Sequence, residues 1–270
     1  MEREDVRMKF RKAVIPGAAL ALFLAGCNGE EKSEGRKDEA EKAAVNPANV
    51  SKDKAEDEPK TISGRLLLFE FEQSAKDTPI RDEKAAEMIK NSKDIMEQLG
   101  GETPEVKEQI AVQGIEGAAV ISAIEEVYGS TIEFDEHGVL FVTEPANKGE
   151  ENAIWAGFKN PDDKTEKVRK LLQKQIDEGK ILAKYIHFFK SPYTAADAYA
   201  LQDQVGNSLN KLLEASGEDS TYALSVDIIT GDITLQHDAI SDAVIEQLKA
   251  QYPDQKFQIE SGVKMEPYEE

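Results

Sequence analysis

Histidine, cysteine and carboxylate side chains are the residues of this sequence that could carry out catalysis or bind a metal ion. The histidines, His137, His187 and His237, lie at least 50 residues apart, so no two have the spacing of a metal-binding pair. Cys27 is the only cysteine, which excludes an internal disulfide or a thiolate zinc site. No nucleophile elbow, phosphate-binding loop or dinucleotide fingerprint is present. We therefore expect no metal, no cofactor and no catalytic residue, although a Ser-His-Asp triad assembled in space stays open.

The segment before Cys27 has the order of an export signal. Basic residues at positions 9, 11 and 12 precede residues 13–25, which are apolar except for a proline and a glycine. This run of 13 residues is shorter than the roughly 20 that a transmembrane helix needs. The pattern therefore favours a cleaved signal. Translation starts either at Met1 or at Met8, which opens the more basic signal Met-Lys-Phe-Arg-Lys.

The residues at the end of this signal, Leu24-Ala25-Gly26-Cys27, resemble the lipobox of bacterial lipoproteins. The resemblance implies cleavage just before Cys27 and attachment of lipid, with its acyl chains, to the thiol. The small side chains of Ala25 and Gly26 would let the backbone enter the peptidase, while Leu24 fills an apolar pocket. The expected location is the outer face of the cytoplasmic membrane, to which the lipid on Cys27 binds.

Composition predicts a tether between the anchor and a folded part. Residues 28–60 contain almost no large apolar side chain and are rich in charged and small residues, so they should be disordered. We expect a signal peptide at 1–26, a lipidated acidic tether at 27–60, an N-terminal α/β part at 61–118 and a C-terminal α+β domain at 119–270. Whether the last two form one domain or two is left open.

The charge of the chain limits its partners. There are 53 acidic and 33 basic residues, and without residues 1–26 the net charge is near −22. Such a surface repels nucleic acid and anionic lipid headgroups, so we expect no nucleic-acid partner. Solubility outside the cell explains the excess of acids, and selective binding of cations is the alternative.

Periodicity predicts an α+β fold, with a small mixed or antiparallel sheet and helices packed on one face. Residues 62–71 read as a strand, 82–99 and 117–128 as helices, and 131–134 with 139–142 as a hairpin. From Asp163 the expected order is α-β-α-β-β-α-β. We expect one shared core in this last segment, formed by Val168, Leu171, Leu172, Ile186, Phe188, Leu209, Leu212, Val226, Ile228, Val244, Leu248 and Phe257.

Three stretches between residues 119 and 262 are similar to the propeptide-type α+β domain of secreted alpha-lytic and streptogrisin-like proteases. They are residues 128–135, residues 192–203 with their tyrosine-led helix, and the late hairpin at 225–234. In that family the domain is a folding template and inhibitor of a protease on the same chain. Because no protease-like segment follows in these 270 residues, the resemblance implies at most a binding fold.

The absence of recognisable catalytic chemistry favours a non-enzymatic binding or interaction module at the membrane–cell wall boundary. The expected partner is another extracytoplasmic protein, bound through exposed Trp155, Phe158 and Tyr193. One alternative is a surface-anchored hydrolase, with His187 or His237 beside two carboxylates in a deep pocket. Another is an inhibitor or chaperone of an exported protease.

Overall fold

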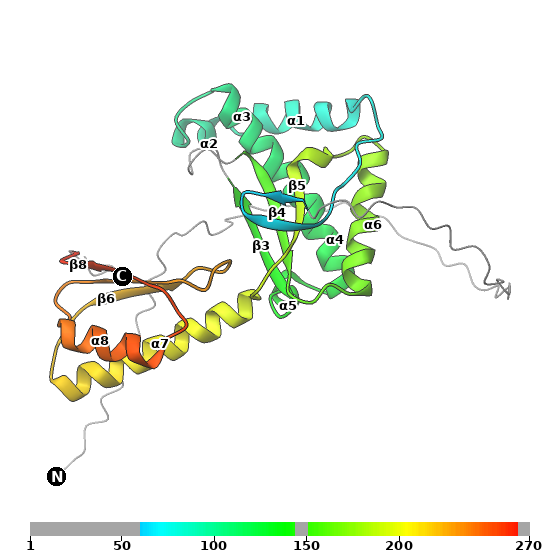
Figure 1. The fold of residues 1–270 in the computed structure, drawn as a ribbon. Coiled ribbons are helices and arrows are strands. Elements are labelled where there is room, and N and C mark those ends of the chain that lie inside the picture. The colour runs from blue at the N-terminus through cyan, green and yellow to red at the C-terminus, as the bar shows by residue number, and fades with distance from the viewer. Residues whose placement is uncertain (1–59, 144–150, 264–270) are drawn as a thin grey trace, which may run out of the picture.

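The computed structural model describes residues 60–143 and 151–263, which form an α+β fold with two separate sheets (Figure 1). This confirms the fold class expected from periodicity. The predicted signal peptide, Cys27 and nearly all of the predicted tether lie outside the described residues.

The larger sheet has five strands in the order β1-β2-β5-β4-β3. The strands are β1 (Thr61–Ile62), β2 (Arg65–Phe69), β3 (Gly138–Thr143), β4 (Ala153–Phe158) and β5 (Ile186–Lys190). Strands β4 and β5 are parallel, and the other neighbours are antiparallel. All six residues of the inner strand β4 are buried. An unbroken apolar sequence suits this position, because an inner strand covered on both faces needs apolar residues at every position.

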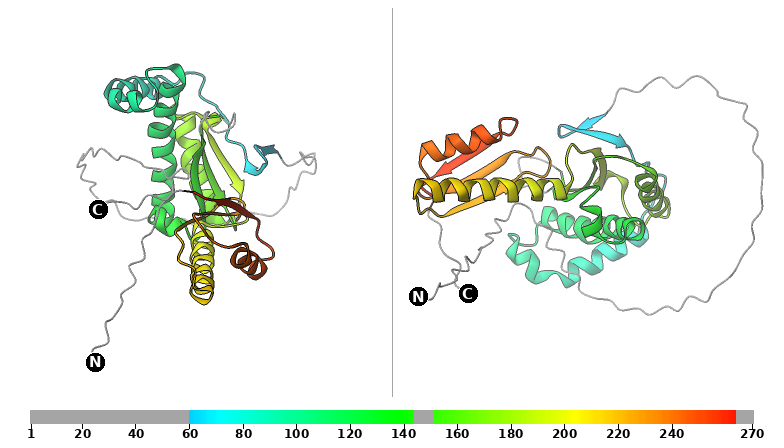
Figure 2. Two further views of the ribbon diagram at one scale, coloured as in Figure 1. Left: turned by 90° about the vertical axis from the view of Figure 1, so that its left-hand side faces the viewer. Right: turned by 90° about the horizontal axis from the view of Figure 1, so that it is seen from below.

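Helices cover one face of this sheet (Figure 2). They are α1 (Pro79–Asn91), α3 (Pro104–Ala111), α4 (Ala118–Tyr128) and α6 (Asp163–Asp177), and a π-helix (Val112–Gly117) joins α3 to α4. Their apolar sides meet alternate residues of β4 and β5 in one core, which includes Val120, Ile124, Ile154, Phe158, Val168, Leu172, Ile186 and Phe188. The short helix α2 (Lys93–Gln98) buries Met96 against α3.

The opposite face of the sheet packs against Ala195 and a turn of the C-terminal part. Phe141, Trp155 and Phe189 lie on this face, and Ile228 and Ile229 from a turn of the C-terminal part pack against them. The guanidinium carbon of Arg65 lies 4.6 Å from the centroid of the Trp155 ring.

The C-terminal part consists of a long helix, a second helix and the three-stranded sheet. Its elements are α7 (Ala195–Ser216), β6 (Tyr222–Val226), β7 (Ile233–His237), α8 (Asp242–Gln251) and β8 (Phe257–Ser261). The sheet order is β6-β7-β8, with β6 and β7 antiparallel and β7 and β8 parallel. Thr194 and Asp197 form the capping box that begins α7.

The prediction that the residues after Asp163 share a single core is wrong. Residues from α6 and β5 belong to the core of the larger sheet, whereas those from α7, β6, α8 and β8 belong to a second core. The boundary drawn at residues 118 and 119, which left open whether one domain or two are present, falls inside the continuous helical run from α3 to α4. The chain passes from one sheet to the other at α7, which begins at Ala195.

The prediction of a strand at residues 131–134, as the first half of a hairpin, is also wrong. Thr131–Phe134 is a short helix, α5, and the antiparallel partner of β3 is β4. Ser130 caps α5, since its hydroxyl accepts a hydrogen bond of 3.0 Å from the Glu133 amide. One of the three stretches that carry the resemblance to protease propeptides therefore has a helix where a strand was expected, while the late hairpin is present as β6 and β7.

Candidate functional site

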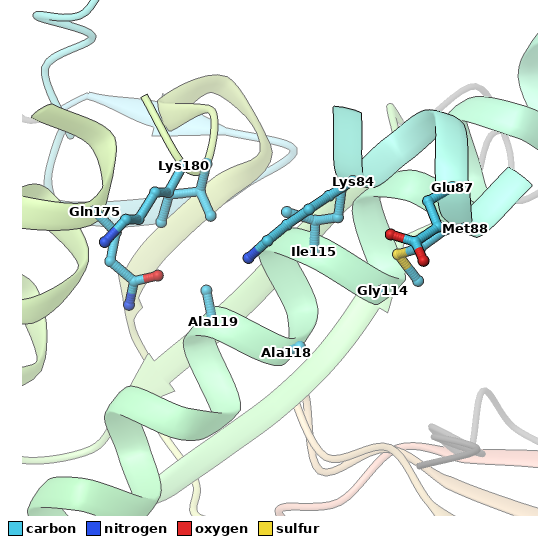
Figure 3. Close-up of a pocket in the computed structure, with 10 residues that line it drawn as sticks. Lys84, Glu87, Met88, Gly114, Ile115, Ala118, Ala119, Gln175 and Lys180 are labelled. Carbon is cyan, nitrogen blue, oxygen red and sulfur yellow. The ribbon is translucent and has the colours of Figure 1, made fainter. Parts of the chain in front are cut away.

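A cavity of about 350 Å³ opens between α1, the helical run of the π-helix and α4, and the C-terminal end of α6 (Figure 3). Its floor is apolar and its sides carry charged and amide groups. It is lined by Lys84, Glu87, Met88, Gly114, Ile115, Ala118, Ala119, Gln175, Lys180 and Ile181. A volume of this size lies at the lower end of the range that small-molecule sites occupy.

The cavity exists where the helical run is least regular. Residues 112–117 form a π-helix, a rare widening of the helix that is often found at functional sites. Within it, a Cβ atom on Gly114 would lie 1.8 Å from the Cε atom of Met88. The absence of a side chain at Gly114 lets the Met88 thioether lie this close to the backbone.

Polar groups from two elements converge on the cavity. In Figure 3 the Lys84 ammonium from α1 and the Gln175 amide from α6 point toward the space above Ala119, whereas the Lys180 side chain extends along the α6 side, away from Lys84. Glu178 forms an ion pair of 2.5 Å with Lys180, whereas the only carboxylate in the lining, Glu87, lies beside Met88. The cavity thus offers the Lys84 ammonium and the Gln175 amide above a floor of alanine and isoleucine, with Lys180 and its partner Glu178 at one side.

A buried ion pair fixes the elements that enclose the cavity. The Glu116 carboxylate, which is 0% exposed, accepts hydrogen bonds from Arg81 Nε at 3.1 Å and from the Leu182 amide at 3.1 Å. These contacts join α1, the π-helix and the segment after α6. Burial raises the pKa of Glu116, and its hydrogen bonds to Arg81 and Leu182 oppose that shift.

A tyrosine adjoins this ion pair. The Arg81 guanidinium lies 5.7 Å from the centroid of the Tyr185 ring, and the Tyr185 hydroxyl donates a hydrogen bond to Glu108 of α3. Burial, followed by the nearby Glu108 carboxylate, raises the pKa of Tyr185. The phenol therefore stays protonated at neutral pH and keeps donating its hydrogen bond to Glu108. This bond connects α3 to the segment after α6, which the Glu116 ion pair already joins to α1.

The aromatic binding surface expected from the sequence is not present. Trp155 and Phe158 are 2% and 1% exposed and lie on opposite faces of β4. Tyr193 is half-buried, and its ring packs so closely on Gly231 that an added Cβ would lie 2.8 Å from Cζ. Their burial leaves Trp155 and Phe158 no surface with which to contact a partner.

The three histidines lie in three different environments. His137 is exposed after α5, beside Tyr128. His187 is half-buried on β5, 4.5 Å from Trp155 between ring centroids, and burial lowers its pKa. His237 is 2% exposed, and its Nδ1 accepts a hydrogen bond of 3.0 Å from the Ile240 amide.

The arrangement that would favour a hydrolase is not found around these histidines. Glu70 and Glu151 are near enough to His187 to influence its pKa, but within residues 60–143 and 151–263 no carboxylate hydrogen-bonds to it. Neither His187 nor His237 lines the cavity. The same described ranges contain no group of three or more histidine, cysteine or carboxylate side chains that could hold a metal ion.

Sequence reasoning missed the residues that line the cavity, although one signal for them exists. Gly114 and Ala118 are four residues apart, so they place small side chains on one side of a helical run and leave room beside it. The lysines gave no such signal, since charged residues are frequent throughout the chain.

Leu24, Ala25, Gly26 and Cys27 lie outside the described residues, so the structure does not bear on the lipobox. Within the described ranges, no helix has the length and apolar character needed to cross a bilayer. No protein-family model matches the chain, and no curated protein matches it.

Proposed function

We propose that this protein is a lipid-anchored extracytoplasmic binding protein whose cavity receives the anionic group of a small ligand. The anchor is supported by the sequence alone, through the basic segment, the short apolar run and Leu24-Ala25-Gly26-Cys27. Lipid on Cys27 would hold the protein at the outer face of the cytoplasmic membrane, and residues 28–60 would connect it to the folded part.

The observation that carries the binding proposal is the placement of the Lys84 ammonium and the Gln175 amide over an apolar floor. The protein has a net charge of −20, so a lysine whose ammonium faces a hollow differs from the general charge of the surface. An anion placed beside Lys84 gains a charge-assisted hydrogen bond, and the Gln175 amide can donate another. An aliphatic portion of the ligand would contact Ile115, Ala118 and Ala119.

These features favour a carboxylate, or a similar anion, attached to a short aliphatic body. Octanoate is a suitable probe, and octylamine is its matched control, because the two share an alkyl chain but differ in charge. Calorimetric titration of the full-length protein in mild detergent should show saturable binding of octanoate and none of octylamine. Equal binding of both probes would contradict the assignment of the cavity.

Variants locate the binding. Lys84→Gln should weaken octanoate binding by about tenfold, which is what losing a hydrogen bond to a charged group corresponds to. Lys211→Gln removes an exposed lysine of α7 and should leave binding unchanged. Gly114→Ala should also weaken binding, since Met88 must then move. If only Lys211→Gln affected binding, the ligand would lie elsewhere.

The extracytoplasmic protein partner expected from the sequence is part of this proposal. With Trp155 and Phe158 buried, such a partner would have to bind another surface. Crosslinking in living cells, followed by identification of the captured protein and comparison with a Cys27→Ser strain, tests for it. A captured partner that depends on the anchor would support the proposal.

A further inference from the structure

A second hollow lies along the same pair of helices, beyond the cavity. It is a groove of about 490 Å³ between the C-terminal end of α4 and the length of α6. Val127 and Leu171 are its apolar residues, and Glu126 is its only carboxylate. Its remaining lining residues are Lys164, Lys167, Lys170 and Lys174.

The four lysines are an unusual grouping for so acidic a chain. Along α6 they follow one another at intervals of three, three and four residues, which places them as neighbours on one side of the helix. All four are exposed. Like charges at this spacing repel one another and oppose helix formation, so the grouping is not explained by the stability of α6.

Few carboxylates compensate these charges. Among the ion pairs of the described residues, only one involves the groove lysines, between Lys170 and Glu166 at 3.8 Å. Glu166 is shared, because it also binds Arg169 through two hydrogen bonds of 2.7 and 2.6 Å. The Lys164 ammonium lies over the ring of Tyr128, 4.9 Å from its centroid. The groove therefore concentrates positive charge on a surface that is otherwise acidic.

We infer that this groove binds an extended polyanion with aliphatic phosphodiester repeats. The lysines span eleven residues of helix, with the first and last about 15 Å apart along the axis, so they can meet several successive anionic groups of one linear chain. Lysine binds phosphate as a compact point charge on a flexible stem, so the four lysines can follow phosphates whose spacing is not fixed. The aliphatic links between phosphates would lie on Val127 and Leu171.

The shape of the site selects a linear polymer over a membrane surface. A groove admits a chain but keeps a flat bilayer away from its floor. This inference does not depend on the lipid anchor. It does not depend on the cavity beside Lys84 either, because the cavity and the groove share no lining residue.

The test is a titration of the full-length protein in mild detergent with poly(glycerol phosphate) at several salt concentrations. Wild-type protein should bind it, with an affinity that falls as salt rises because counterions are released. The Lys167→Gln/Lys174→Gln variant should bind more weakly, and the slope of log affinity against log salt should fall by about one for each lysine removed. Glutamine keeps a high helix propensity, so α6 should remain folded.

Three controls make the result specific. Lys167→Arg/Lys174→Arg keeps the charge and should retain most of the binding, and Lys211→Gln/Lys256→Gln removes two exposed lysines elsewhere and should change nothing. Without polymer, the groove variant should be at least as heat-stable as wild type, since repulsion is relieved. Unchanged binding by the groove variant would overturn the inference. Preference for poly(glutamate) or for phosphatidylglycerol vesicles would overturn it too.

Discussion

Replacing Leu248 by alanine should destabilise the three-stranded sheet far more than the five-stranded one. Leu248 lies on α8, is 0% exposed and belongs to the core formed with α7 and the three-stranded sheet. A leucine-to-alanine change at such a site costs about 2–5 kcal/mol, out of a total stability of about 5–15 kcal/mol. For a unit of this size that corresponds to a fall in Tm of about 10 °C or more.

Amide hydrogen exchange followed strand by strand measures where this loss falls. Leu248→Ala should reduce protection in β6, β7 and β8 and leave β4 and β5 protected. Leu172→Ala is the matched variant, because Leu172 is also 0% exposed but lies in the core of the larger sheet, and it should give the reverse pattern. Equal loss of protection in both sheets for either variant would refute the reasoning, because it would show that the two cores unfold as one.

Four further outcomes are expected. Glu116→Gln, which leaves Arg81 buried without its counter-charge, should lower the denaturant-derived free energy of unfolding by about 3 kcal/mol. His137→Ala should change it by less than about 0.5 kcal/mol, because His137 is an exposed turn residue. Burial lowers the pKa of His187 in the folded protein. As the pH falls below 6.5, the imidazole is therefore protonated in the unfolded chain first, and the folded protein loses stability until the pH reaches the folded-state pKa. His187→Gln should flatten the fall in Tm between about pH 7 and 5. Cys27→Ser should leave the precursor uncut and poorly retained on cells, whereas unchanged gel mobility and detergent partitioning would refute the anchor.

Local capping chemistry explains where the sequence interpretation of the first hairpin failed. Thr131–Phe134 alternates as a strand does, but Ser130 and Glu133 have the Ser-x-x-Glu spacing of a helix start. Gly129 ends α4 with a φ of +102°, and the Glu133 carboxylate lies where a Cβ atom of Gly129 would be. In a four-residue segment these contacts outweigh β propensity, which depends on packing.

The buried state of Trp155 and Phe158 could have been predicted, whereas the cavity could not. Both parities of β4 are apolar, which is the pattern of an inner strand, and the parallel pairing with β5 gives it that position. The cavity instead brings together residues near 84, 116 and 180 through one buried ion pair. No local spacing records that pairing, because Arg81 and Glu116 meet only after α1 has docked.

The pairing of β2 with β5 also sets an order of assembly. Leu67 pairs with Phe189, a residue that follows it by more than a hundred positions. At a synthesis rate of 5–20 residues per second, β2 would emerge about 10 seconds before its partner. Such non-local pairing is slow, because the entropy of closing the loop is lost before any contact between the strands stabilises it. Until then β2 and its leucines lack their partner strand β5. A nascent chain stalled before residue 186 should therefore be a substrate for chaperones and prone to aggregation.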